Sequence, residues 1–113
     1  MSELMNKVPF KTNEGYVFFN TNDIVRFEAS RNHILVYVVS VEKPYNIQMS
    51  ITEIQLKLNN EKIMFKCHRC HLINLMHVLE FKEKSRIILT NNGSVPLSET
   101  YLKSFKETWC VDQ

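Results

Sequence analysis

Residues 24–41 read IVRFEASRNHILVYVVSV, and this stretch sets the fold class of the chain. Residues 24–29 alternate apolar and polar side chains, and after the polar group at 30–33 the chain enters a run rich in β-branched residues at 34–41. Alternation with a period of two and β-branched side chains are both typical of strands. The stretch therefore predicts a β-hairpin with a polar tip.

Further strand signals lie on both sides of this hairpin. Before it, residues 8–12 and 16–20 predict two short strands across a three-residue turn that ends in Gly15, which can take the positive φ that such turns need. After it, Pro44 can only begin or edge the next strand, residues 45–49, because proline donates no ladder hydrogen bond. The remaining expected strands are residues 63–67, 75–81, 86–90 and 94–97.

One or two short helices are expected among these strands. Ser50 and Glu53 fit a capping box, in which the side chain of each residue accepts the backbone amide of the other, and apolar residues then recur at helical spacing up to Leu58. Ser98 can cap a second turn or helix that runs through Phe105. The apolar residues expected in the core are Ile24, Val25, Phe27, Leu35, Tyr37, Phe65, Leu72, Ile73, Phe81 and Phe105.

The composition is that of one globular domain. The chain has 113 residues, of which 44% are hydrophobic and 23% are charged, so it is too apolar to be disordered. We expect a flexible N-terminal end at 1–7 and one domain at 8–113. The apolar runs are far shorter than the roughly 20 residues that span a bilayer, and no secretion signal is visible, so we expect a cytoplasmic protein without membrane contact.

Several classes of function are disfavoured. Gly15 and Gly93 are the only glycines, so neither a dinucleotide-binding fingerprint nor a phosphate-binding loop is present. The only aspartates, Asp23 and Asp112, stand in no spacing typical of a catalytic triad, so we expect neither an enzyme nor a cofactor. The net charge of +2 is only mildly basic and by itself assigns no partner.

A CHRCH string begins at Cys67 and matches the C-x-x-C-H pattern of covalent haem attachment. Its flanks favour strands, and the sequence carries no export signal, both of which argue against haem. With His33 or His77 the string could also hold zinc, whereas free cysteines are more commonly small, partly buried residues. One alternative function is therefore a metal- or haem-binding protein that uses Cys67, Cys70 and His71.

A family resemblance runs through most of the chain. Residues 65–75, FKCHRCHLINL, resemble the F-x-R-x-H-R-S-Y-L-V-N-L core of LytTR-type DNA-binding domains, the effector modules of many bacterial response regulators. The resemblance implies a mainly β fold with elongated antiparallel sheets of about ten short strands and one or two short helices. Three further segments occur in the family's order: residues 24–29 with Asn32 and Tyr37, residues 50–58, and residues 92–98 with Tyr101 and Phe105.

The resemblance implies a transcriptional regulator that binds double-stranded DNA in a sequence-specific manner. In this family, loops on one side of the sheets enter successive major grooves, and binding to paired direct repeats places a second copy of the protein beside the first. No receiver domain is attached, so we expect either a stand-alone regulator or a segment of a longer one. A second alternative is a protein-interaction module that has kept the fold and lost its affinity for DNA.

The resemblance assigns two loops to DNA. In the first loop, Arg31 suits guanine or phosphate, Asn32 can pair with adenine, and His33 can contact a base edge. In the second loop, the planar guanidinium of Arg69 matches the O6 and N7 acceptors of guanine. His68 beside it either contacts DNA or braces the loop.

A third DNA-facing region is expected at the start of the last helix. Lys103 suits a phosphate, whereas the acidic Glu99 makes base reading from this region uncertain. The sequence also departs from the family core at Cys70 and His71, which replace a serine and a tyrosine and leave the chemistry that supports the second loop open. The candidate contacts of the third region are Ser98, Thr100 and Lys103.

Overall fold

The fold was analysed in a computed structural model that describes residues 7–58 and 63–110. These residues form ten antiparallel strands in three sheets, together with two α-helices and two 3-10 turns, so the expected mainly β fold is confirmed. The elements are β1 (Lys7–Thr12), β2 (Gly15–Asn20), η1 (Thr21–Asp23), β3 (Ile24–Ser30), β4 (His33–Val38), β5 (Tyr45–Ile47), α2 (Ile51–Lys57), β6 (Met64–His68), β7 (His71–Asn74), η2 (Leu75–His77), β8 (Val78–Lys82), β9 (Ile87–Thr90), β10 (Gly93–Pro96) and α3 (Glu99–Thr108).

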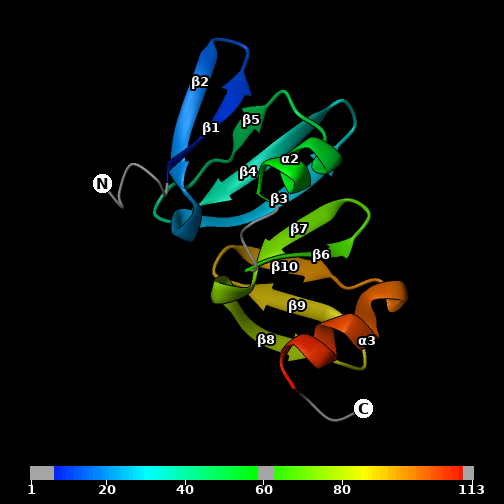
Figure 1. The fold of residues 1–113 in the computed structure, drawn as a ribbon. Helices are drawn as coiled ribbons and strands as arrows, with labels where there is room; N and C mark the ends of the chain where they lie inside the picture. The colour runs from blue at the N-terminus through cyan, green and yellow to red at the C-terminus, as the bar shows by residue number, and fades with distance from the viewer. Residues whose placement is uncertain (1–6, 59–62, 111–113) are drawn as a thin grey trace.

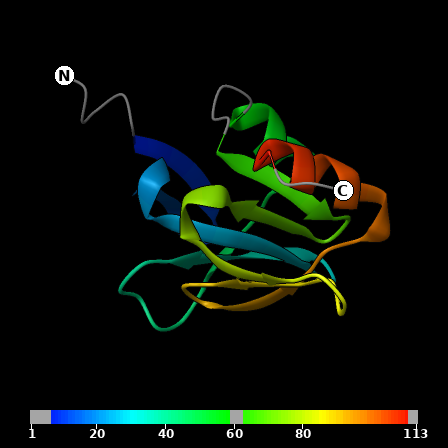
Figure 2. The ribbon, with the colours of Figure 1, turned by 90° about the horizontal axis from the view of Figure 1, so that it is seen from below.

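A five-stranded sheet in the order β5-β4-β3-β7-β6 forms the centre of the molecule (Figure 1). Leu72 and Ile73 are consecutive in β7, and consecutive strand residues point to opposite faces. Leu72 packs into the core shared with the β1–β2 hairpin and α2, whereas Ile73 packs into the core shared with the sheet β10-β9-β8 and α3. The central sheet therefore separates two hydrophobic cores, and the layers are visible from below (Figure 2).

The expected core is largely confirmed. Six of the ten residues expected there are buried. The side chains of the other four are half-buried: Leu35, Tyr37, Phe65 and Phe81. In the part of the chain that the structure describes, none of the helices is long and apolar enough to cross a membrane.

The β3–β4 hairpin forms as predicted, but its second strand is shorter than expected. Ser30 pairs with His33 across the two-residue tip. The strand expected at 34–41 ends at Val38, because the chain turns at Ser40, which has a positive φ of 64°. The expectation that this strand continues to residue 41 was therefore wrong.

The N-terminal hairpin also differs in detail from the prediction. Gly15 has the expected positive φ, 139°, but it pairs with Thr12 as the first residue of β2, so the turn has two residues and not three. Lys7 pairs with Asn20 and so belongs to β1 and not to a loose end. The other residues of that expected end, 1–6, lie outside the described residues.

The strand expected at 75–81 begins later than predicted, at Val78, where β8 starts. Residues Leu75–His77 form a 3-10 turn, and the side chain of Asn74 caps it by accepting the backbone amide of Met76 at 2.8 Å. This turn separates β7, which belongs to the central sheet, from β8, which belongs to the three-stranded sheet. The prediction that residues 75–77 belong to a strand was wrong, because the turn depends on a capping side chain and not on apolar periodicity.

Both helices begin where they were expected. The Ser50 hydroxyl accepts the amide of Glu53 at 3.1 Å and the Glu53 carboxylate accepts the amide of Ser50 at 2.8 Å, so the capping box is confirmed. Ser98 caps α3 by accepting the amide of Thr100 at 3.4 Å. Helix α3 ends at Thr108, three residues beyond the predicted end.

Candidate nucleic-acid interface

Three turns lie along one edge of the molecule: the β3–β4 tip, the β6–β7 turn and the start of α3 (Figures 1 and 2, right-hand side of each). Backbone hydrogen bonds connect them. The amide of Ala29, next to the β3–β4 tip, donates to the carbonyl of Cys70 at 2.8 Å, and the amide of Ser98 donates to the carbonyl of Cys67 at 2.8 Å. The β6–β7 turn therefore holds the other two turns in place.

A shallow hollow of about 530 Å³ lies between the first two turns. Arg31, Asn32 and His33 line it from the β3–β4 tip, and Arg69 lines it from the β6–β7 turn. Arg31, Asn32 and Arg69 are exposed, and His33 is half-buried. The structure thus brings together four of the residues that the sequence singled out, although they come from segments more than 30 positions apart.

The segment between β5 and α2 forms the third wall of the hollow. Gln48 and Glu53 line it, together with Ser50. Sequence reasoning assigned Ser50 and Glu53 to a helix cap and did not consider Gln48 at all. Gln48 is exposed two positions before Ser50, but no local pattern in the sequence shows that this segment faces the β3–β4 tip.

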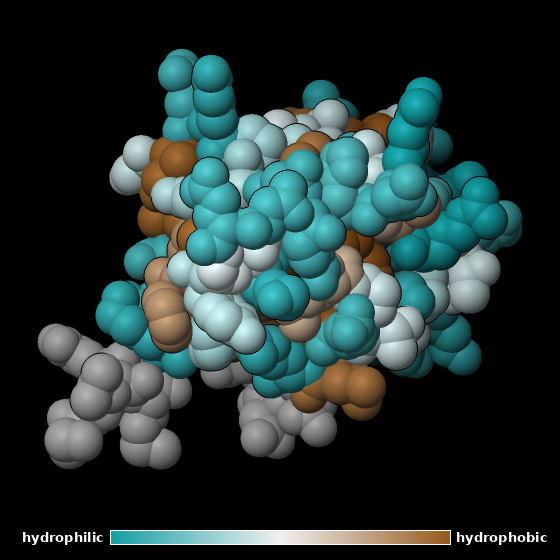
Figure 3. All heavy atoms as spheres, turned by 90° about the horizontal axis from the view of Figure 1, so that it is seen from above, coloured by the Kyte–Doolittle hydropathy of each residue, from teal (hydrophilic) through white to brown (hydrophobic). Residues whose placement is uncertain are grey.

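Hydrophilic side chains dominate the face seen from above, the end of the molecule that carries the β1–β2 hairpin (Figure 3). Separate hydrophobic patches interrupt them. Among the described residues, the exposed large hydrophobic side chains are those of Tyr16, Phe18, Leu56, Met76, Leu79 and Trp109.

The β3–β4 tip holds a strained residue. Arg31 has a φ of 55°, in the left-handed region that residues other than glycine and asparagine rarely adopt. A conformation of this kind costs on the order of 1 kcal/mol. The exposed Arg31 side chain forms no ion pair within the described ranges, so its guanidinium is available to an external anion or base edge.

The β6–β7 turn is braced by its own histidine. The backbone amide of Cys70 donates to Nδ1 of His68 at 3.1 Å, and the His68 and His71 rings lie edge to face with centroids 5.3 Å apart. His68 does not line the hollow, whereas the exposed Arg69 at the apex does. The hydrogen bond gives His68 a bracing position in the turn, and a contact of His68 with DNA stays a prediction.

The third region lies on the same edge but outside the hollow. The Ser98 hydroxyl is occupied in capping α3, while Thr100 and Lys103 are exposed on the first turns of that helix. None of these three residues lines the hollow. Any contact that they make with a ligand must therefore be separate from the contacts of Arg31, Asn32 and Arg69.

A polar cluster lies within the central sheet, around Arg26. The buried Arg26 lies with its guanidinium 3.8 Å from the ring centroid of Tyr37, donates from Nε to the Asn92 carbonyl at 2.9 Å, and pairs with Glu28 at 2.8 Å. These contacts satisfy the charge of a buried arginine. They also connect the central sheet to the β9–β10 turn.

His71 lies beside this cluster and is poorly suited to carry a charge. Its Nδ1 is buried without a hydrogen-bond partner. Burial lowers the pKa of His71 below its ordinary value of 6.5, and the neighbouring carboxylate of Glu28 opposes this shift without reversing it. Burial therefore favours the neutral form of His71.

Cys67 is unsuited to the alternative function suggested by the CHRCH string. Cys67 is fully buried in β6, its thiol approaches the His71 carbonyl at 3.9 Å, and burial raises the pKa of the thiol to about 12. Over residues 7–58 and 63–110, no three His, Cys, Asp or Glu side chains are grouped so that they could hold a metal ion. A metal- or haem-binding protein is not favoured.

The described residues thus form a domain built from antiparallel sheets with a polar edge. The model of the LytTr DNA-binding domain family matches residues 14–109, and the chain belongs to this family. The resemblance seen in the sequence is therefore confirmed. The family is one of DNA-binding domains of transcriptional regulators, which is not a class of enzyme.

Curated relatives are transcriptional regulators and are longer than this chain. The transcriptional regulatory protein BtsR of Salmonella typhi is 35% identical over 101 residues, which cover 85% of the chain and 40% of BtsR. BtsR of Escherichia coli K12 is 39% identical over 77 residues, 64% of the chain and 30% of the relative. The sensory transduction protein LytT of Enterococcus faecalis is 31% identical over 86 residues, 64% of the chain and 35% of the relative. The chain thus spans between 30% and 40% of these relatives.

A solved structure supports the fold independently. A LytTr DNA-binding domain from Bacillus cereus superposes with a TM-score of 0.73 over 92% of this chain and 96% of that one. The sequence identity is 20%, so this likeness concerns the fold alone.

Proposed function

We propose that this chain regulates transcription by binding double-stranded DNA in a sequence-specific manner through the turns of its polar edge. The β3–β4 tip and the β6–β7 turn enter the major groove, and the start of α3 lies against the phosphate backbone. Two copies bind side by side at paired direct repeats.

The observation that carries the proposal is the shared hollow between the two turns. Arg31, Asn32 and Arg69 are exposed around one hollow of about 530 Å³. Side chains that converge in this way can reach the edges of neighbouring base pairs in one site. Backbone hydrogen bonds fix the turns that carry them, which limits the entropy lost on binding.

Each side chain has a distinct role in the proposal. Arg69 donates two hydrogen bonds to O6 and N7 of a guanine, and Asn32 pairs with N6 and N7 of an adenine. Arg31 contacts a neighbouring guanine or a phosphate, and His33 contacts a base edge. His68 acts through the turn by holding Arg69 at its apex, since its Nδ1 accepts the Cys70 amide.

The modest net charge of +2 fits a protein in which a few cations contact phosphate. Lys103 is exposed near the start of α3 and suits a phosphate beside the groove. Substitution of Lys103 by alanine is expected to weaken binding to all sequences equally and to lower the slope of log K against log salt by about one.

DNA selection from randomised duplexes, at fixed salt and with reduced protein, tests the proposal. The wild type is expected to enrich a repeated motif. The Arg69→Ala variant is expected to lose about 1 to 3 kcal/mol of binding free energy and to relax the preference at one base position. The Asn32→Ala variant is expected to relax a different position.

Lys43→Ala provides the matched control. Lys43 is an exposed cation in the β4–β5 connection, at the end of the β3–β4 hairpin opposite to its tip. Its removal is expected to leave the base preferences intact. A loss that is equal at every base after Arg69→Ala would refute base reading by Arg69, and failure of the wild type to enrich any sequence would favour a protein-interaction module on the same fold.

A further inference from the structure

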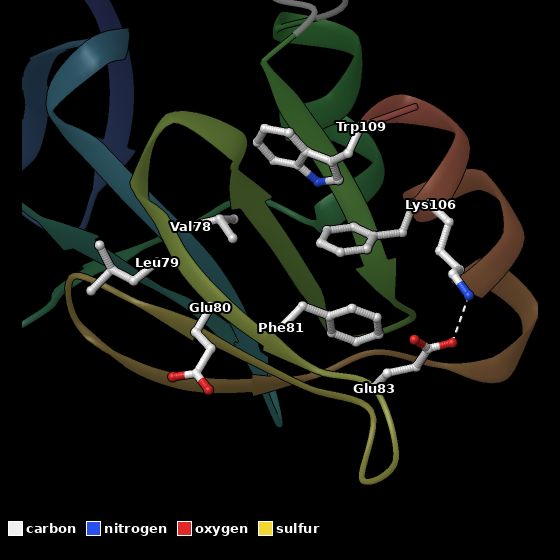
Figure 4. A pocket seen from close by; sticks show the side chains of 8 residues that line it. Val78, Leu79, Glu80, Phe81, Glu83, Lys106 and Trp109 are labelled. Carbon is white, nitrogen blue, oxygen red and sulfur yellow. Dashed lines mark hydrogen bonds and ion pairs between the residues drawn. The ribbon is translucent and has the colours of Figure 1, made fainter. Parts of the chain in front are cut away.

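An open apolar groove lies at the end of the molecule away from the β1–β2 hairpin, between β8 and α3 (Figure 4). Its volume is about 420 Å³, within the range of sites that accept side chains or small ligands. Phe81 and Phe105 line it with ring centroids 5.0 Å apart, and Trp109 continues this aromatic series at 6.2 Å from Phe105. Phe105 itself is buried, whereas Phe81 is half-buried and Trp109 is exposed, so these two rings present aromatic surface at the groove.

The rim of the groove is both apolar and acidic. Leu79 is 66% exposed and Trp109 is 44% exposed, and both line the same groove, so they give its rim apolar surface. At one end Glu83 forms an ion pair with Lys106, whereas the exposed Glu80 makes no ion pair with any described residue. Glu80 is therefore available to a cation on whatever fills the groove.

The outer face of the β1–β2 hairpin has the complementary character. Cross-strand pairing sets Lys11 beside Tyr16 and Pro9 beside Phe18 on this face. Tyr16 is 62% exposed and Phe18 is 60% exposed, and the Lys11 ammonium lies 5.5 Å from the Tyr16 ring centroid. The face joins exposed aromatic rings to lysine and carries no acidic side chain on its two strands.

We propose that the outer face of the β1–β2 hairpin of one copy docks into the β8–α3 groove of a second copy. Phe18 and Tyr16 cover the aromatic groove, and Lys11 pairs with Glu80 of the second copy. This inference rests on the proposed function, because it supplies the contact between copies that bind adjacent repeats.

The placement of the two surfaces supports a head-to-tail contact. The hairpin and the groove lie at opposite ends of a molecule whose longest dimension is 44 Å (Figure 1). A contact between two different patches is heterologous, so successive copies can keep the same direction along the DNA, as direct repeats require. A contact of one patch with itself would relate two copies by a two-fold axis and would suit inverted repeats. Neither surface includes Arg31, Asn32 or Arg69, so the polar edge stays free for DNA.

The contact is expected to be weak without DNA, because a single hairpin face and one groove bury less surface than stable dimers do. Its effect should appear as cooperativity. The experiment compares binding of the full chain to duplexes that carry one copy or two direct copies of the selected site. Glu80→Lys and Lys11→Glu are each expected to lower two-site cooperativity about tenfold with little change in one-site affinity.

A charge exchange and two matched controls make this test specific. The double variant with Glu80→Lys and Lys11→Glu restores opposite charges across the contact, so its cooperativity should recover. Glu42→Lys and Lys43→Glu change the same charges at exposed positions of the β4–β5 connection and should leave cooperativity unchanged. Cooperativity that survives both single variants, or that fails to recover in the double variant, overturns the proposal.

A cross-linking measurement separates this inference from the proposed function, since it needs no DNA. Chains with Phe18→Cys and chains with Leu79→Cys are mixed in a Cys110→Ser background, which removes the exposed native thiol. Oxidation should join the two kinds of chain, whereas Thr52→Cys, at an exposed position of α2, should not replace either partner. Cross-linking without DNA binding would support the contact and refute the DNA function, and equal cross-linking by Thr52→Cys would refute the contact.

Discussion

The side-chain amide of Asn74 donates to the backbone carbonyl of Ile24 at 2.8 Å, across 50 positions of sequence. The same amide reaches the carbonyl of Thr21 at 3.3 Å, and its oxygen accepts the amide of Met76. Asn74 is fully buried, so one side chain connects the start of β3 to the end of β7 and begins the turn toward β8. The asparagine of the family core is therefore a structural residue in this chain.

Asn74→Ala is expected to lower the free energy of unfolding by about 2 kcal/mol, because buried backbone groups lose their partners. Asn74→Asp should cost a similar amount, since it keeps the acceptor and removes both donors. Asn22→Ala changes an exposed asparagine on the neighbouring 3-10 turn and should cost less than about 0.5 kcal/mol. Urea denaturation measures all three, and equal stability of Asn74→Ala and Asn22→Ala would contradict the structural role.

Local signals in the sequence were sufficient to predict much of the fold. The β3–β4 hairpin follows from alternation and β-branched side chains, and the Ser50–Glu53 capping box follows from residue types three positions apart. The break between β7 and β8 was missed because Asn74 depends on carbonyl groups about 50 positions away. Periodicity reports which residues are apolar and not which distant groups a polar side chain will meet.

The candidate site, too, could be predicted only in part from the sequence. Arg31 and Arg69 could be named from the sequence, because polar residues at turns between apolar strands are available to ligands. That they line one hollow depends on the pairing of β3 with β7, which sets Glu28 beside His71 and so brings the two turns together. Gln48 was missed for the same reason, since only the folded chain sets the β5–α2 segment against the β3–β4 tip.

The buried thiol of Cys67 is expected to resist alkylation in the folded protein. A pKa raised to about 12 keeps this thiol protonated at pH 8, and only the thiolate reacts with iodoacetamide. Cys110 is exposed and should react first. Mass spectrometry of tryptic peptides should show modification of Cys67 only after unfolding in guanidinium chloride, and a rate for Cys67 equal to that of Cys110 in native buffer would contradict this assignment.

Stability is expected to fall in mild acid because of His71. Burial lowers the pKa of His71 in the folded state below 6.5, so the unfolded chain binds more protons in this range and stability rises with pH. The contribution is complete above pH 6.5 and is lost as the pH falls toward the lower, folded-state pKa. Denaturation between pH 5 and 7.5 should show this slope in the wild type and a smaller one in His71→Gln. An unchanged slope in the variant would assign the pH dependence to other groups.

Strain at Arg31 predicts that stability and DNA binding respond differently at this position. Arg31 holds a φ of 55°, which glycine adopts without the penalty that a β-carbon brings. Arg31→Gly and Arg31→Ala both remove the guanidinium, so both should weaken binding to the selected DNA site by a similar factor. Only the Arg31→Gly variant relieves the backbone strain. We expect its free energy of unfolding in urea denaturation to exceed that of the Arg31→Ala variant by about 1 kcal/mol. Equal stability of the two variants would show that the tip relaxes at no cost, and different affinities would show that the backbone, and not only the side chain, shapes the contact with DNA.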